Sequence, residues 1–140
     1  MSYRQFQHVL LTATSVVLNT SGVAVADQWS PGPYPHVIRN FWGMNTTTLA
    51  NVSGAVAVLE RVSHDVATTA TAIATLNFTA TGGAGIVFYE DDIQFEVGPG
   101  DVTRIDITDA ATVAATALFG MYVEPRWEVA GNATNVKATT

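Results

Sequence analysis

The chain has 140 residues, of which 48% are hydrophobic and only 13% are charged, whereas ordinary soluble domains carry about 25% charged residues. This length suits one domain with its own hydrophobic core, over residues 1–140, and the absence of cysteine excludes disulfides and thiolate metal sites. The net charge of −6 and the single lysine exclude the clustered cations that nucleic-acid binding requires.

The first 26 residues allow two interpretations. Arg4, the apolar stretch 9–18 and the small residues 24–26 resemble a secretory signal peptide with its cleavage site after Ala26. The apolar stretch is interrupted by hydroxyl side chains, and Gln5, Gln7 and His8 add no strong positive charge to Arg4 before it, so we expect it to be retained. Residues 7–18 then predict one long strand or two. We expect no membrane partner, because no stretch reaches the roughly 20 apolar residues that span a bilayer.

Glycine and proline divide the middle of the chain into short elements. Residues 19–22 predict a turn, and the proline-rich segment 29–35 predicts an extended loop, because each proline lacks an N–H group. Strands are expected at 36–42 and at 55–62, the latter with Val56, Val58 and Val62 on one face. Residues 64–78 are compatible with helix or strand, and their threonines favour a strand for the second half.

The clearest pattern lies between residues 93 and 107. Apolar residues alternate with polar ones at 93–97 and again at 104–107, and the glycines and proline of 98–101 separate the two runs, which predicts strand, turn and strand. Further expected elements are a turn at 82–85, a strand at 86–89, a short helical turn capped by Asp109, a strand at 118–123 ending before Pro125, and an exposed tail at 131–140.

Many short strands separated by glycine and proline predict an all-β fold. The simplest architecture is a single β-sandwich, jelly-roll-like or immunoglobulin-like, with extended terminal arms.

No residue pattern indicates catalysis or a cofactor. His8, His36 and His64 are far apart and lack the spacing of paired metal ligands, so we expect no metal site. His64 and Asp65 are adjacent, and neighbouring strand residues point to opposite faces. No serine lies in a G-x-S-x-G turn, so we expect that the protein is not an enzyme.

The segment 90–109 carries the whole net charge, with seven acidic residues against Arg104. These carboxylates could ligate calcium if their loops converged, but the spacing of a calcium-binding loop is missing. We favour charged turns and outer-face residues that protect strand edges, and the same carboxylates could also meet a basic partner.

Aromatic residues near predicted loops are the candidate binding groups. Trp29, Trp42 and Trp127, with Tyr34 and Tyr122, could form a platform on which sugars stack. Core plugs and interface anchors are the commoner roles of such residues. We therefore expect a protein interface that includes Trp29, Pro31, Tyr34, Trp42 and Trp127.

The segments 97–107 (VGPGDVTRIDI) and 120–127 (GMYVEPRW) resemble the auxiliary virion proteins of tailed bacteriophages, particularly capsid decoration or cement proteins. The resemblance covers the second half of the chain. It implies a β-sandwich that binds the major capsid protein on the capsid surface, as a homotrimer, and braces contacts between capsomers. The low charge, the loop at 29–35 and the polar tail suit such a role. The alternatives are a phage tail or head-fibre component and a secreted carbohydrate-binding module.

Overall fold

The computed structural model describes residues 6–12, 14–47, 50–51, 54–63, 69–78, 81–82, 84–112 and 114–126, with the backbone alone for 23–28, 50–51 and 81–82. In this part of the chain there are strands, turns and no helix, and hence no helix that could cross a membrane. The strands are β1 (Gln7–Leu10), β2 (Val16–Val17), β3 (Gly22–Trp29), β4 (His36–Asn45), β5 (Ala50–Asn51), β6 (Ala55–Val62), β7 (Ala70–Phe78), β8 (Thr81–Gly82), β9 (Val87–Glu90), β10 (Phe95–Val97), β11 (Val102–Asp109) and β12 (Thr116–Pro125).

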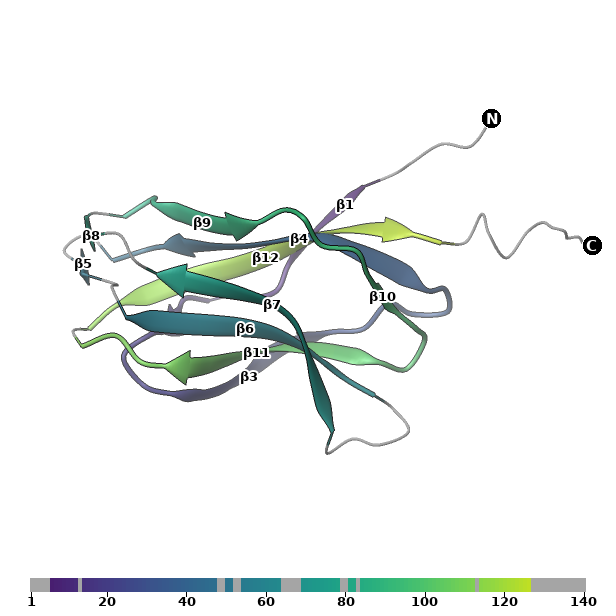
Figure 1. Ribbon diagram of the computed structural model, residues 1–140, viewed down its shortest axis with the longest axis horizontal. Coiled ribbons are helices and arrows are strands. Elements are labelled where there is room, and N and C mark those ends of the chain that lie inside the picture. The colour runs from purple at the N-terminus through teal and green to yellow at the C-terminus, as the bar shows by residue number, and fades with distance from the viewer. Residues whose placement is uncertain are drawn as a thin grey trace, which may run out of the picture.

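Ten of these strands form two antiparallel sheets that lie face to face (Figure 1). In sheet A, β12 and β4 are central. The edge strands β1 and β2 pair with successive parts of β12, and β9 and β10 pair with successive parts of β4. Sheet B has the order β3-β11-β6-β7, and β5 and β8 form a separate short ladder. The all-β sandwich is therefore confirmed.

The path of the chain between the two sheets is that of a jelly roll. The chain passes from sheet A to sheet B at β3 and returns at β4. It enters sheet B again at β6 and β7, returns at β9 and β10, and then places β11 in sheet B and β12 in sheet A. Apart from β6 and β7, strands that follow one another do not pair within a sheet. This winding decides between the two kinds of sandwich that the sequence left open.

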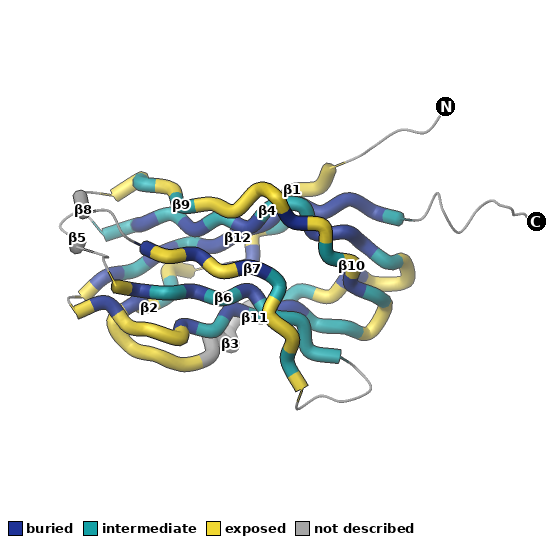
Figure 2. Tube along the Cα trace, viewed as in Figure 1, coloured by how far each residue is buried: buried dark blue, intermediate teal, exposed yellow. Residues whose placement is uncertain are grey.

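Alternation of apolar and polar residues sets the inner face of each strand. In β11, Thr103, Ile105 and Ile107 are buried while Arg104 and Asp106 face outward. Figure 2 shows this alternation along the central strands, whereas the edge strands β1 and β9 are largely exposed.

Most of the strands expected from the sequence are present in the structure. They are those at 36–42, 55–62, 86–89, 93–97, 104–107 and 118–123. The second half of 64–78 is also a strand, and residues 7–18 contain two strands.

The inner face of β6 is not the valine face. Ala55, Ala57 and Leu59 are buried, and Val56 and Val58 are half-buried on the outer side. Small side chains thus form part of the inner face of β6, and phenylalanines of other strands lie in the core. Both faces of β6 are apolar, so alternation by itself did not identify the inner one.

Three phenylalanines from different strands form the centre of the core. The ring centroids of Phe41 and Phe119 are 5.9 Å apart, and those of Phe78 and Phe119 are 6.0 Å apart with the rings edge to face. Gly43 lies beneath them. A Cβ atom at that position would come within 2.8 Å of the Phe119 ring and 3.0 Å of the Phe78 ring. Glycine is therefore required there by the close approach of two buried rings.

The turn predicted at 98–101 is present, but it joins two different sheets. The Gly98 N–H donates to Asp101 Oδ2 at 2.9 Å, and the Asp101 N–H donates to the Gly98 carbonyl at 3.1 Å. Gly100 has a φ of 87°, which glycine adopts without strain. Before the turn, β10 belongs to sheet A, and after it β11 belongs to sheet B.

The N-terminal segment is part of the sandwich. Leu11 and Leu18 are buried in the core, and β3 runs through the residues on both sides of Ala26. Cleavage after Ala26 would remove β1 and β2 and cut β3 in two. The sequence predicts a turn at 19–22 and a loop from residue 29 but no strand between them, where β3 lies.

The expected helical turn after Asp109 is wrong. Asp109 ends β11, and the described residues 110–112 and 114–115 contain no helix. Instead this connection pairs with the N-terminal segment: the Ala111 N–H donates to the Leu18 carbonyl at 2.8 Å, and the Leu18 N–H donates to the Ala115 carbonyl at 2.8 Å. These hydrogen bonds attach the connection to the N-terminal segment. The expected arms, including the tail at 131–140, lie outside the described residues, as does the first half of 64–78.

Candidate functional site

The outer face of sheet A carries three rows of uncharged side chains. Cross-strand register places His8 beside Tyr122 and Tyr122 beside Asn40. The next row runs from Leu10 across Gly120 and Trp42 to Tyr89, and the third runs from Leu118 across Met44 to Val87. None of these residues is charged, whereas the outer face of sheet B carries charged residues such as Arg104 and Asp106.

Trp42 lies flat against the sheet because Gly120 leaves room for its ring. A Cβ atom on Gly120 would come within 2.3 Å of the indole, so any larger residue would displace the ring. The indole Nε1–H donates to His8 Nε2 at 3.0 Å. This N–H lies in the plane of the indole, so the hydrogen bond places His8 beside the indole and not over it. The two ring planes are inclined by only 17°.

The aromatic groups surround a shallow, open hollow of about 420 Å³. His8 also contacts Tyr122, with 4.9 Å between ring centroids. Tyr89 is 64% exposed and Tyr122 is 43% exposed. We call this site the aromatic hollow; it is lined by His8, Asn40, Trp42, Met44, Val87, Tyr89 and Tyr122.

The lining of the aromatic hollow is mostly aromatic and uncharged. No carboxylate, lysine or arginine lines it, and its only ionisable groups are an imidazole, whose Nε2 accepts from Trp42, and two phenols. Asn40 adds an amide that can both donate and accept hydrogen bonds. The arrangement therefore suits recognition of a neutral ligand.

A second hollow, of about 440 Å³, lies over hydroxyl groups that already bond to one another. Thr116 Oγ1 is 2.8 Å from Thr46 Oγ1 and 2.9 Å from Thr47 Oγ1, and the Thr116 N–H donates to Thr47 Oγ1 at 2.7 Å. Ser15 Oγ lies 2.9 Å from Thr46 Oγ1. This network joins β4, β12 and the connection before β2, and its role is structural.

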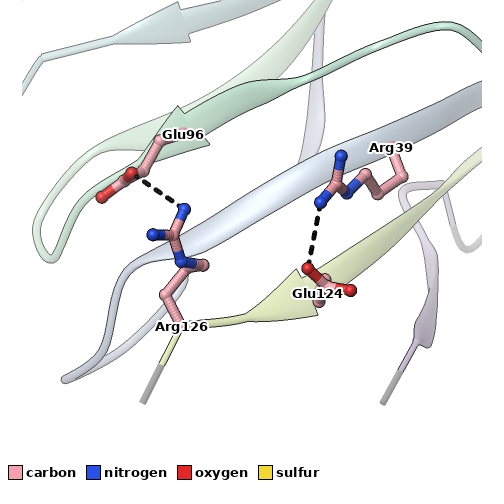
Figure 3. Close-up of polar contacts among 4 residues, drawn as sticks. All are labelled: Arg39, Glu96, Glu124 and Arg126. Atoms are coloured by element: carbon pink, nitrogen blue, oxygen red, sulfur yellow. Dashed lines mark hydrogen bonds and ion pairs between the residues drawn. The ribbon is translucent and has the colours of Figure 1, made fainter. Parts of the chain in front are cut away.

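Charged groups of sheet A gather where β4, β10 and β12 meet (Figure 3). Arg39 Nη2 donates to Glu124 Oε1 at 3.1 Å, and Arg126 Nη1 lies 3.5 Å from Glu96 Oε1. Glu124 is almost fully buried, so its pairing with Arg39 offsets the cost of removing a carboxylate from water. The two pairs tie the end of β12 to the strand β4 and to the edge strand β10.

The acidic segment 90–109 is spread over turns and outer faces. Glu96 meets Arg126, Asp101 caps the turn at Gly98, and Glu90 Oε1 accepts from the Asp92 N–H at 3.4 Å. In the residues that the structure describes, no group of three or more carboxylates or imidazoles could share a metal ion.

The structure separates the aromatic residues that the sequence analysis had grouped. Trp42 and Tyr122 both line the aromatic hollow. Trp29 is half-buried, edge to face with His36 at 5.4 Å. Pro31 is buried and Tyr34 is 49% exposed. Trp127, His64 and Asp65 lie outside the described residues.

Five members of the aromatic hollow were not identified from the sequence: His8, Asn40, Met44, Val87 and Tyr89. Two signals were available. Asn40, Trp42 and Met44 alternate along β4, and Val87 and Tyr89 alternate along β9, so each set shares one face. Their meeting depends on the pairing of β4 with β9 and of β1 with β12.

Comparisons with known proteins give no family for this chain. No protein-family description matches the sequence, and no curated protein matches it. Two structures of infectious bursal disease virus align with most of the chain. The Gx strain structure has a TM-score of 0.44 and 11% identity over 88% of this chain, and the Gt strain structure has a TM-score of 0.21 and 10% identity over 89%. The chain spans 33% and 38% of those chains, respectively. Assignment of the jelly roll rests on the strand order of this chain.

Proposed function

We propose that this protein is a non-catalytic structural component of a virion that binds the outside of a capsid and stabilises contacts between capsomers. Jelly rolls are an architecture of viral capsid, lectin and cupin domains. The resemblance of 97–107 and 120–127 to tailed-phage auxiliary proteins supports a decoration protein that contacts the major capsid protein and assembles as a homotrimer. A tail or head-fibre position is the alternative within the same class.

One observation carries this proposal: exposed apolar side chains are concentrated on one side of the sandwich. Seven large hydrophobic side chains are exposed in the described residues, and all except Tyr34 lie on or directly beside strands of sheet A. A free monomer seldom leaves such residues gathered on one side, and a gathered set is typical of a surface that meets another protein.

The surface that we propose contacts the capsid is the edge of sheet A formed by β1 and β2. Phe6, Leu10 and Val17 are each about half exposed there, and we call these three residues the apolar edge. Neither β1 nor β2 contains a charged residue. Edge strands are usually protected by lysine or proline, so an uncharged apolar edge suits pairing with another chain.

The test is binding of the purified protein to tailed-phage capsids that lack their decoration protein, followed by light scattering and co-sedimentation. The wild type should add in a fixed ratio to capsomers. Leu10→Lys with Val17→Lys should abolish this binding, because two ammonium groups would be buried without partners. The matched control is Thr75→Lys with Asn77→Lys, two exposed positions of β7, the edge strand of sheet B.

Two outcomes would count against the proposal. Unchanged capsid binding by the Leu10→Lys, Val17→Lys variant would remove the apolar edge from the interface. A wild-type protein that stays monomeric and binds no capsid would leave the decoration role without support. Circular dichroism and thermal melting of both double variants separate loss of contact from loss of fold.

A further inference from the structure

We propose that the aromatic hollow is a binding site for neutral oligosaccharides. None of the three residues of the apolar edge lines the hollow, although His8 lies on the same strand as Leu10, and sugar binding does not depend on capsid binding. The inference rests on the shape, the chemistry and the rigidity of the hollow.

The shape of the site fits a flat ligand. Trp42 lies against the sheet over Gly120 and presents its outer ring face, and His8 extends this surface at an inclination of 17°. A pyranose ring has one or two broad faces made of C–H groups, which pack well on an aromatic ring face. The hollow, at about 420 Å³, falls within the 300–1,000 Å³ that small-molecule sites occupy.

The polar groups of the site match the rim of a sugar. Tyr89, Tyr122 and Asn40 line the hollow, and their hydroxyls and amide can donate and accept hydrogen bonds. Sugar hydroxyls also donate and accept, and they project from the edge of a ring whose faces are apolar. A mixture of ring faces and neutral hydrogen-bonding groups therefore complements a sugar more closely than a purely apolar segment.

The absence of charge in the hollow defines the class of sugar. None of the lining residues is lysine or arginine, so a carboxylate, sulfate or phosphate group would lose water without gaining a cationic partner. Neutral glycans have no such cost. The absence of a lining carboxylate indicates binding without hydrolysis, since glycoside hydrolysis generally uses two carboxyl groups.

The rigidity of the site lowers the cost of binding. The hydrogen bond to His8 and the contact with Gly120 hold Trp42 in place before the ligand arrives. Preorganised groups lose less conformational entropy on binding, so even a shallow site can hold a sugar. A protein partner would more often insert a side chain into a deep pocket, and this hollow is open.

The test is isothermal titration of the purified chain with neutral hexasaccharides (maltohexaose, cellohexaose and chitohexaose) and with acidic glycans (sialyllactose and a heparin hexasaccharide). We expect binding of at least one neutral hexasaccharide, with a change in tryptophan fluorescence, and no binding of the acidic glycans. Tyr89→Ala should weaken this binding roughly 3- to 10-fold, the range of one aromatic contact. Tyr89 is well exposed, so its loss should not affect folding.

Tyr34→Ala is the matched control, because Tyr34 is another exposed tyrosine and lies outside the hollow. It should bind sugar like the wild type. Gly120→Ala, which displaces Trp42, should weaken binding and remove the fluorescence change. Failure of every neutral hexasaccharide to bind at millimolar concentration would overturn the proposal, as would equal binding by the Tyr89→Ala and Tyr34→Ala variants. Loss of capsid binding in Tyr89→Ala, with no sugar bound by the wild type, would identify the hollow as a protein contact instead.

Discussion

Replacement of Gly43 by alanine tests the packing of the core directly. The new Cβ atom would lie 2.8 Å from a ring carbon of Phe119 and 3.0 Å from one of Phe78. Ordinary carbon contacts are about 3.5–4.0 Å, so a ring must move by about 1 Å. Phe119 has no exposed surface, and Phe41 and Phe78 lie around it, so the movement has little free space.

The expected effect is a net loss of stability. Overpacking of a core costs about 1–3 kcal/mol. The same substitution gains about 0.4–1 kcal/mol by restricting the unfolded chain, because Gly43 does not have a positive φ. We therefore expect a loss of about 1–2 kcal/mol in the free energy of unfolding. This corresponds to a decrease of about 3–7 °C in the melting temperature of a chain of this size.

Urea denaturation, with calorimetry for the melting temperature, measures this effect. The matched control is Gly98→Ala, because a Cβ atom at Gly98 would meet only Asp101 Oδ2 at an ordinary 3.7 Å, and its stability should be unchanged or slightly raised. In a Phe119→Leu background the ring is gone, so Gly43→Ala should cost less than in the wild type. Equal cost in both backgrounds, or no cost in the wild type, would refute this account of the core.

Three further substitutions test individual contacts by the same urea assay. Thr12→Val should cost about 1–3 kcal/mol, because the buried Phe119 N–H donates to Thr12 Oγ1 at 3.0 Å and would lose its acceptor; a cost near zero would contradict this. Arg39→Met should lower the free energy of unfolding by about 1–3 kcal/mol, because Glu124 would lose its partner. The double variant with Glu124→Leu should lose less than the sum of the two single variants. Additive losses would mean that the pair does not act as a unit. Gly100→Ala should cost about 1–2 kcal/mol because its φ is 87°, and an unchanged midpoint would show that the turn relaxes.

Local sequence determined where most of the strands and the turn at 98–101 lie, although it did not indicate β3. The alternation at 104–107 reappears as the buried face of β11, and the glycines of 98–101 produce the turn before it. These features depend on side chains within a few residues of one another, so a single sequence contains them. Composition likewise determined the low charge of the surface and the acidic character of 90–109.

Tertiary structure decided which sheet each strand joins and which face of a strand points inward. The turn at 98–101 would suit a hairpin, but β10 and β11 pair with strands of different sheets. In β6 both faces are apolar, and the inner face carries the small alanines because the rings of other strands occupy the core. Periodicity defines two faces, and only the neighbouring strands determine which one is buried.

The aromatic hollow also depends on pairings between distant residues. His8 meets Tyr122 because β1 pairs with β12, and Trp42 lies beside Tyr89 because β4 pairs with β9. The sequence identified Trp42 and Tyr122 as candidates, since large aromatic residues in an uncharged chain suggest contacts. It did not indicate that Gly120 lies beneath Trp42, because a glycine without a positive φ has no local signature. The close approach of two strands makes that glycine necessary.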